Sequence, residues 1–499
     1  MQFDAPRGSD EWWLSRLMEK LAAQVEEVDL MGRWLRGTQP IPCPDNQKPG
    51  FERLQKIANV NLAELIVDAR VHRMQLLGAS TVGQFADSGD DRVDALFEEQ
   101  DLRALLSNAF RAALGEGVAY LMVTAEGGIR FADGKHAVLE DGPNGSTLAA
   151  VNIYRDEAAD RDVAILARPG YFRFFYHEGP TGLPGQKWWR FFPGAWTAGE
   201  RVESPLNEVP MYQLTPPGGR SLIRKHIAGL ERINHGILQR MILISLQAFK
   251  QRALKGAPQE DPKTGKPIDY DAVFETAPDA LWILPESVEI WESGQADFGP
   301  VLTAVKDDIR AVAVASKTPL FMISPDDANG SAEGAATQRE ILVFDIESIT
   351  ALFEGKLKRV LSAALRLRGD LDPEEATRLK LLWANPRRSS LMERAQSLLT
   401  ARSGDVPFRM ALEKFGEFTP AEVEEAVQQR TADAFLEAAI AASGANSTTP
   451  ASAGSTAVSV TGGTPRATPP SGGTPAQLPA PALDARRAAG PESGGLNGG

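Results

Sequence analysis

Cysteine is almost missing from this chain: Cys43 is the only one among 499 residues. A single thiol excludes an internal disulfide framework and is typical of proteins in a reducing cytoplasm. The chain also lacks any apolar run of the roughly 18–20 residues that a membrane-spanning helix needs. Acids and tryptophans occupy the N-terminus, where a signal peptide has a basic start and an apolar core. We therefore expect a protein without disulfides, membrane spans or a secretion signal.

Catalytic and metal-binding motifs are missing as well. Gly265-Lys266 is followed by Pro267, where a phosphate-binding Walker loop has Ser or Thr, and this argues against an ATPase. The scattered histidines include no pair with the i,i+4 spacing of metal ligands, and one cysteine argues against a zinc site. The histidines are His72, His136, His177, His226 and His235. We expect no catalytic residue, no metal and no cofactor, although a triad assembled in space from distant residues leaves the enzyme alternative open.

Two kinds of periodicity occupy separate blocks of the chain and predict the α+β class. The length exceeds what one core comfortably holds, so two or more structural units are expected. Apolar residues recur at spacings of three and four over residues 9–77, with a proline-rich connector at 37–50, and again over residues 92–114. Gly115-Glu116-Gly117 ends this helical block. From about 118 to 214 the period falls to two between turn residues, which predicts an antiparallel, hairpin-rich β subdomain.

Two predicted helices flank a mixed insert in the middle of the chain. Residues 219–254 form the first helix and residues 297–316 the second. Between them, short apolar runs at 280–284 and 288–291 predict strands. The first helix has a strongly basic side that faces a single acid, Glu231. Its cations, with one just beyond it, are Arg220, Arg224, Lys225, Arg232, Arg240, Lys250, Arg252 and Lys255.

Residues 316–361 are the most informative stretch. An apolar run at 320–323 leads into a loop whose residue types favour turns over helix or strand. The loop residues are Ser324, Pro325, Asp326, Asp327, Ala328, Asn329 and Gly330. Ser331 is then placed as the N-cap of a proline-free helix over residues 332–368, about 50 Å long at 1.5 Å per residue. Its apolar face consists of Leu342, Ile346, Ile349, Phe353, Leu357, Val360 and Ala364.

The C-terminal part is predicted to be helical and then disordered. Helical stretches cover residues 374–382, 391–400 and 407–415, and Thr419-Pro420 begins a last helix as N-cap and first-turn residue. From Ser443 onward the chain is made mainly of Gly, Pro, Ser, Thr and Ala. Such a segment buries too little apolar surface to offset the entropy of ordering, so residues 443–499 are predicted to be disordered.

Several motifs, in this order, make residues 10–440 resemble the portal proteins of tailed bacteriophages, of the siphophage type. Gly219-Arg220-Ser221 opens a helix that contains Asn234, as the family has a Gly-x-Ser start and an Asn in the same helix. Thr318-Pro319 precedes the polar loop, and Ser331-Ala332 starts the long helix. Trp383-Ala384-Asn385-Pro386 leads into Ser389-Ser390-Leu391, where the family has Trp-x-Asp/Asn-Pro followed by Ser and a helix.

The resemblance implies a ring subunit with a defined order of parts. The wing covers residues 1–218, the first stem helix 219–254, the clip 255–296 and the second stem helix 297–317. A tunnel loop follows at 318–331, then the long tunnel helix and wing return at 332–385. Residues 386–442 form a helical crown before the disordered tail.

The resemblance also implies a function and partners. Portals form a homododecameric ring at one capsid vertex, through which double-stranded DNA is packaged and ejected without sequence reading. Residues 324–330 are then the tunnel loop that faces the DNA. The implied partners are the terminase motor, the major capsid protein and the head–tail adaptor, with no membrane. The ring is then assembled in the host cytoplasm and resides in the virion.

The net charge of -13 agrees with a channel more than with a sequence reader. Proteins that read DNA neutralise phosphates with clusters of Lys and Arg, whereas an acidic wall lowers adhesion to a sliding duplex. Acidity alone decides little, because many soluble proteins are acidic. The basic side of helix 219–254 is either solvated or a contact surface for neighbouring subunits or DNA. The alternatives to a portal are another capsid-associated ring or minor head protein and an enzyme with a spatially assembled site.

Overall fold

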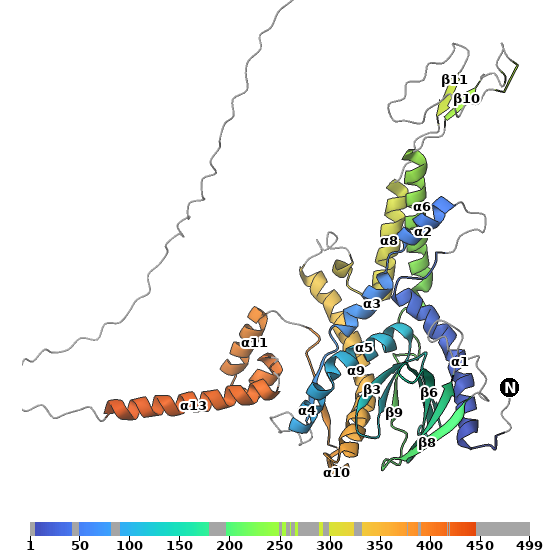
Figure 1. The fold of residues 1–499 in the computed structure, drawn as a ribbon. Helices are drawn as coiled ribbons and strands as arrows, with labels where there is room; N and C mark the ends of the chain where they lie inside the picture. The colour runs from blue at the N-terminus through green and yellow to red at the C-terminus, as the bar shows by residue number, and fades with distance from the viewer. Residues whose placement is uncertain are drawn as a thin grey trace, which may run out of the picture. The chain divides into compact units, whose positions relative to one another are not determined.

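Helices and antiparallel strands alternate in blocks along the chain and form an α+β fold (Figure 1). The computed structural model describes residues 5–41, 49–80, 90–178, 196–248, 252–255, 260, 265–267, 289–292, 299–323, 332–376, 378–387, 391–416, 418 and 420–445. The chain divides into two units, Met1–Asp433 and Ala434–Gly499. In the described residues, no helix is both long and apolar enough to cross a bilayer.

Two antiparallel sheets form the β block. The larger sheet has the strand order β4 (Ala137–Asp141), β5 (Thr147–Asp156), β6 (Arg161–Arg168), β7 (Tyr171–Glu178) and β8 (Thr197–Glu203). The smaller sheet has the order β3 (Ile129–Asp133), β2 (Ala119–Val123) and β9 (Met211–Leu214). The predicted hairpin-rich subdomain is therefore confirmed in the described residues. The expected strand around Trp188–Phe192 lies outside them.

The first helix, α1 (Asp10–Leu35), covers one face of the five-stranded sheet. Ser9 caps it by accepting a hydrogen bond from the backbone of Trp12, as its sequence predisposes it to do. Leu17, Leu21 and Val25 pack against alternate residues of β4–β7. The opposite face of the sheet packs on the three-stranded sheet through Tyr120 and Met122. Because successive side chains of a strand point to opposite faces, the same strands pack against α1 on one face and against the three-stranded sheet on the other.

A second core lies around the long helix α9 (Ala332–Arg368), whose bounds match the prediction. Its predicted apolar face is buried along its length, including Leu342, Phe353 and Val360. Phe110 of α5 (Leu102–Glu116) stacks on Phe353 with ring centroids 5.7 Å apart. The short helix α3 (Leu62–Val71) and strand β1 (Leu76–Ser80) contribute to the same core.

The predicted helix over residues 92–114 is wrong as one element. It consists of α4 (Asp91–Glu99) and α5, separated at Asp101. Asp101 has a left-handed backbone with φ 45°, a conformation that no α-helix accommodates. Val93 and Leu102, one from each helix, are both fully buried, so the break lets both helices bury their apolar faces in one core.

The predicted helix over residues 374–382 is also wrong. Only the turn α10 (Pro373–Ala376) is helical, and β12 (Lys380–Trp383) follows. β12 pairs antiparallel with β1, and the pairing extends to a hydrogen bond from the backbone of Ala384 to the carbonyl of Gln75. A strand partner 300 residues away has overridden the local helical pattern.

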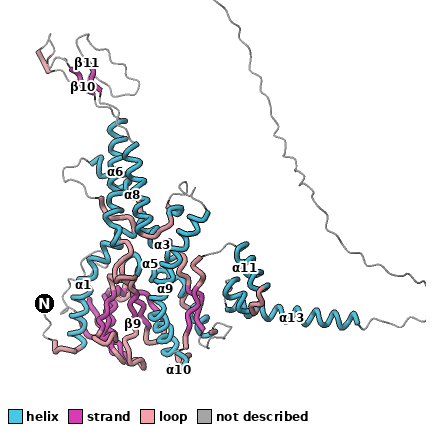
Figure 2. Tube along the Cα trace, turned by 180° about the vertical axis from the view of Figure 1, so that it is seen from behind, coloured by secondary structure: helices cyan, strands magenta, loops and turns pink. Residues whose placement is uncertain are grey.

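Helices α6 (Ile227–Ala248) and α8 (Gly299–Ala315) pack side by side as an antiparallel pair (Figure 2). The predicted helix over 219–254 is shorter at both ends. It begins at Ile227, after a 3-10 turn (Arg224–His226), and ends at Ala248, because β10 (Arg252–Lys255) pairs with β11 (Glu289–Glu292). Glycines allow the close approach: a Cβ on Gly236 would lie 2.7 Å from Cγ2 of Val305, and one on Gly229 would lie 2.6 Å from Cγ2 of Val312. The predicted strand at 280–284 lies outside the described residues.

The remaining helices are short or C-terminal. A second short helix, α2 (Pro49–Ala58), lies against α6. After β12 come α11 (Leu391–Ser403), α12 (Phe408–Ala411) and a π-helical turn (Leu412–Gly416), which pack on one another. The last helix, α13 (Pro420–Ala445), continues past the predicted end at 442, because its Ala-rich sequence sustains helix to Ala445. Residues 446–499 of the predicted disordered tail lie outside the described residues.

Candidate functional site at the base of the paired helices

The residues predicted to line a channel are Ser324, Pro325, Asp326, Asp327, Ala328, Asn329 and Gly330, and they lie outside the described residues. Both attachments of this segment are described. A 3-10 turn (Leu320–Met322) precedes it, and α9 follows it. The turn lies at the C-terminal end of α8. The described part of the site therefore consists of the contacts that hold the 3-10 turn and α9 together.

Arg70 joins the three elements at this point. The residue is 2% exposed and lies in the last turn of α3. It donates from Nη2 to the carbonyl of Ser316 (2.5 Å) just after α8, and from Nη1 to the carbonyl of Ile66 (2.6 Å). Its Nε donates to Oδ2 of Asp345 on α9 (2.8 Å). A buried guanidinium with this many partners fixes the end of α8 against α9.

Lys317 completes the cluster from the turn itself. Its backbone is left-handed, with φ 55°, and its Nζ lies 2.7 Å from Oδ1 of Asp345. The chain reverses here, because Thr318 donates its backbone N–H to the carbonyl of Ala313 (2.9 Å). The Oγ of Ser316 donates to the hydroxyl oxygen of Thr318 (3.0 Å), and both residues are buried. The Thr318-Pro319 motif thus marks a closed turn that directs the chain into the 3-10 turn.

The electrostatics of the cluster follow from burial and pairing. Burial alone raises the pKa of Asp345, but the hydrogen bond from Lys317 and the charge of Arg70 outweigh it, and the pKa lies below its ordinary value. Nearby, burial and the positive charges of Arg70 and Lys225 lower the pKa of His226. At neutral pH the cluster therefore contains two cations and one carboxylate beside a neutral imidazole.

The Gly219-Arg220-Ser221 motif holds the start of the paired helices. Ser221 is buried, donates its hydroxyl to the carbonyl of Gly115 (2.6 Å) and accepts from the backbone N–H of Ile223 (3.1 Å). Gly117 passes close to it, with φ 100°, and a Cβ there would lie 2.9 Å from the nitrogen of Ser221. This contact joins the end of α5 to the segment that leads into α6.

Asn234 fastens α6 farther along. It is buried, accepts the backbone N–H of Val60 (3.0 Å) and donates to Oδ1 of Asn59 (2.8 Å). Asn59 in turn donates to the carbonyl of Gly37, which follows α1. The asparagine of the motif is thus structural: it ties the paired helices to the N-terminal helices.

The Trp383–Pro386 motif ends β12 and turns the chain toward α11. Trp383 lies beside Phe110, with ring centroids 5.9 Å apart. Asn385 accepts the backbone N–H of Arg387 (3.0 Å), which closes the turn. Within the described residues, which exclude 324–331 and 388–390, each of these motifs therefore lies at a junction between elements.

Part of the basic side of α6 is neutralised within the subunit. Arg232 lies 3.0 Å from Oδ1 of Asp308 on α8, and Arg224, just before α6, lies 3.3 Å from Oε1 of Glu27 on α1. These pairs help to join α6 to its neighbours and reduce the charge available to another molecule.

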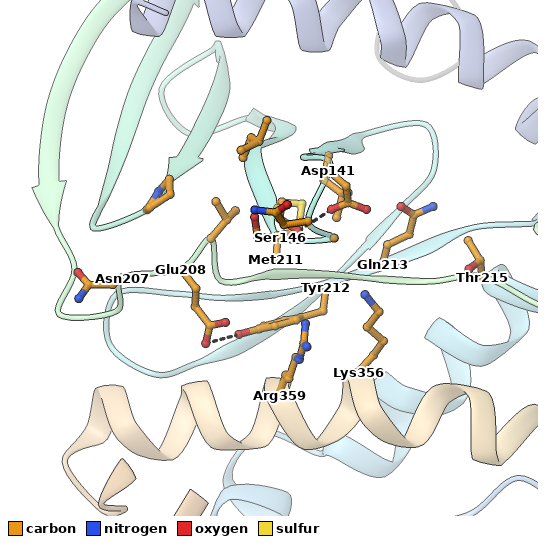
Figure 3. A pocket seen from close by; sticks show the side chains of 17 residues that line it. Asp141, Ser146, Asn207, Glu208, Met211, Tyr212, Gln213, Thr215, Lys356 and Arg359 are labelled. Atoms are coloured by element: carbon orange, nitrogen blue, oxygen red, sulfur yellow. Dashed lines mark hydrogen bonds between the residues drawn. The ribbon is translucent and has the colours of Figure 1, made fainter. Parts of the chain in front are cut away.

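A cavity of about 570 Å³ lies between the β block and α9 (Figure 3). Lys356 and Arg359 reach toward it from α9, and the hydroxyl of Tyr212 donates to Glu208 Oε1 (3.3 Å). Its lining residues include neither His nor Cys. Among all described residues, no group of three His, Cys, Asp or Glu side chains is placed to hold a metal ion. The sequence patterns did not point to this cavity, because its lining comes from hairpins and a helix distant in sequence.

Sequence patterns also missed Arg70, Lys317 and Asp345, which are distant in sequence and belong to no motif. No signal in the sequence singled out Arg70, because Glu64 and Asp68 of the same helix are charged as well.

No protein-family model and no curated protein match the chain. Solved structures do. A chain in the neck of a native GTA particle, computed with C12 symmetry, is 14% identical, with 76% of this chain and 95% of that chain covered and a TM-score of 0.41. A chain of the virion of a native gene transfer agent particle is 15% identical, with 74% and 92% covered and a TM-score of 0.42. An HK97-family phage portal protein from Corynebacterium diphtheriae is 12% identical, with 69% and 94% covered and a TM-score of 0.28.

Proposed function

We propose that this chain is the portal subunit of a tailed phage or a phage-like particle. It forms a homododecameric ring at one capsid vertex, in the virion, after assembly in the host cytoplasm. The ring is a conduit for double-stranded DNA during packaging and ejection. It also binds the major capsid protein, the terminase motor and the head–tail adaptor. The role is mechanical, and the chain is a structural protein rather than an enzyme.

The observation that carries the proposal is the junction of α8, the 3-10 turn and α9. A pair of helices joined by Gly–Val contacts leads into a turn that Arg70 and Asp345 lock in place. The chain then enters residues 324–331 and returns as a helix of 37 residues. This order is the one that the portal resemblance implies: stem, tunnel loop, tunnel helix. A loop held at a rigid base suits a segment that contacts a moving duplex.

Exposed apolar side chains on several helices support an assembly. Val314 on α8 is 81% exposed and Phe344 on α9 is 65% exposed, and further large apolar side chains are exposed on α2 and α11. Exposed apolar side chains mark sites of association where they gather into a patch. Identical subunits that meet head to tail around an axis form a closed ring.

The acidic tunnel loop supports passage without binding. Asp326 and Asp327 repel the phosphates of the duplex within a Debye length, so DNA slides without adhering. The basic side of α6 is partly paired with Asp308 and Glu27, which leaves it a smaller role in DNA contact.

Negative-stain electron microscopy and native mass spectrometry of the purified chain test the proposal. We expect closed rings of uniform size, twelvefold or thirteenfold, with a central channel. Monomers at micromolar concentration contradict it, and hydrolytic activity from such monomers favours the enzyme alternative. Rings that fail to bind a terminase subunit or support DNA packaging favour another capsid-associated ring.

A further inference from the structure

Helix α9 has two apolar faces, and the subunit covers only one of them. The buried face includes Leu342, Ile346 and Phe353. A second stripe consists of the exposed apolar residues Ile341, Phe344 and Leu352, with the exposed Ser348 in line between the last two. We call it the α9 stripe. A surface helix normally has one apolar stripe, so a second one, centred on a phenylalanine 65% exposed, calls for a covering partner.

The stripe is held rigid at its N-terminal part. Asp345, next to Phe344, is fixed by Arg70 and Lys317, and Lys317 follows the end of α8. Val314 near that end is also exposed. The apolar surface is therefore presented on a fixed base, which lowers the entropic cost of association.

A complementary surface lies on α2. Its exposed face consists of Arg53, Lys56 and Ile57, with Val60 just after the helix, and we call it the α2 face. Ile57 is 59% exposed, whereas the neighbouring Ala58 is fully buried. The α2 face thus combines two apolar side chains with two cations.

The two surfaces cannot cover each other within one subunit. Figures 1 and 2 show α2 and the N-terminal half of α9 on opposite sides of the α6–α8 pair. Identical subunits related by rotation bring opposite sides together, and such a head-to-tail contact closes into a ring.

Their charges are also opposite. Glu347 is exposed beside the α9 stripe, whereas Arg53 and Lys56 are exposed on the α2 face. None of these three groups forms an ion pair with another described residue. Complementary charges at the rim of an apolar contact fix its register and exclude wrong pairings.

From these observations we infer that, in the proposed ring, the α9 stripe of one subunit packs on the α2 face of the next. The inference rests on the proposed function and names the partner surface for it. Phe344 contacts Ile57 and Val60, and Glu347 pairs with Lys56 or Arg53. A second copy of this chain is the occupant, not DNA or another protein.

Cysteine cross-linking tests the pairing directly. In a Cys43→Ser background, Ile57→Cys and Phe344→Cys are combined in one chain and treated with a short bis-maleimide. Head-to-tail contact gives a ladder of covalent oligomers up to the full ring on a denaturing gel. Each single variant lacks one of the two thiols and gives no ladder. The matched control combines Ile57→Cys with Leu399→Cys, an equally exposed apolar position on α11, and gives no ladder.

A charge exchange supplies an independent measurement. Glu347→Lys, or Lys56→Glu, lowers the fraction of rings about tenfold at limiting concentration, because like charges then meet. The double variant Glu347→Lys/Lys56→Glu restores ring formation. Mass and thermal unfolding of each variant show that the fold is kept.

The outcomes separate the two proposals. If rings form but both thiols react without a ladder and the charge exchange has no effect, the pairing is overturned and the portal function stands. If the original chain forms no rings at all, the portal function is overturned and the pairing with it. A ladder together with rescue by the double exchange establishes the pairing.

Discussion

The buried Arg70 and the partly buried Asp345 form an ion pair, with Nε 2.8 Å from Oδ2, although 275 residues separate them in the sequence. The pair joins α3 to α9 at the point where the chain leaves α8. It therefore decides how the segment at 324–331 is attached. The following predictions test this attachment and the parts around it.

Loss of the carboxylate at this pair is expected to destabilise the fold strongly. Asp345→Asn leaves the buried Arg70 guanidinium without its counter-charge. Breaking a fully buried pair costs about 3–5 kcal/mol, and because Asp345 is partly exposed we expect a cost at the lower end of that range. Unfolding in denaturant, followed by circular dichroism, measures the change. The control is Asp307→Asn, which removes an exposed pair with Arg310 and is expected to change stability by less than about 0.5 kcal/mol. Equal effects of the two variants would contradict the structural role of the pair.

The free energy of unfolding is expected to fall as the pH rises toward the pKa of Glu116 in the folded chain. Burial, with the nearby charge of Asp133, raises the pKa of this carboxyl from its ordinary value of 4.5 to about 7. Arg36 lies 3.6 Å from it, too far for a hydrogen bond, so burial outweighs this attraction. An acid with a raised folded pKa contributes stability that is fully present below pH 4.5 and is lost progressively between pH 4.5 and 7, by roughly 3 kcal/mol at most.

Glu116→Gln removes this dependence. The variant is expected to match the original chain near pH 4 and to exceed it in the free energy of unfolding near pH 8. Denaturant titrations at several pH values measure the difference. A difference in the free energy of unfolding that stays constant across these pH values would contradict a titration of Glu116.

Close packing of α6 and α8 is expected to tolerate no added bulk. Gly236→Leu places a Cβ 2.7 Å from Cγ2 of Val305, and overpacking of this kind costs about 1–3 kcal/mol. The double variant Gly236→Leu/Val305→Ala is expected to recover part of the loss. The matched control is Gly355→Ala on α9, where a Cβ meets nothing within 4 Å and helix propensity gains up to about 1 kcal/mol. Thermal unfolding compares the three variants. If Gly355→Ala were as destabilised as Gly236→Leu, the loss could not be attributed to close packing between α6 and α8.

Reversal of charge in the proposed tunnel loop is expected to affect DNA and not assembly. Replacing both Asp326 and Asp327 with lysine adds phosphate contacts, so rings are expected to retain DNA at low salt and release it at high salt. Packaging slows or stalls. Ring yield, by native mass spectrometry, stays near that of the original chain. Normal packaging without salt-sensitive retention would show that residues 324–330 do not face DNA.

Removal of residues 446–499 is expected to leave folding and ring formation intact. This segment has few apolar side chains to bury, and a chain that ends at Ala445 keeps all of α13. The melting temperature and the mass of the assembly are the measurements. A shift of several degrees would mean that the tail contributes contacts to the fold.

Local patterns alone determined much of this protein. The length and buried face of α9 follow from its proline-free, 3.6-residue periodicity, and the strands of the β block follow from alternation between turns. Ser221 and Thr318-Pro319 were recognisable as motifs because backbone capping and turn formation depend on neighbouring residues. Thr318 donates to the carbonyl of Ala313 five positions earlier, and Ser221 accepts from Ile223 two positions later. The other bond of Ser221, to the carbonyl of Gly115, is not local and depends on the fold.

Tertiary structure decided the rest. Residues 380–383 became a strand because β1 offered a pairing edge, and the block at 91–116 broke at Asp101 so that both halves could bury their apolar faces. The Arg70–Asp345–Lys317 cluster depends on three elements meeting, and no local pattern encodes such a meeting. Buried charges are stable only where the fold brings their partners together, so the sequence could supply the residues of this site but not their arrangement.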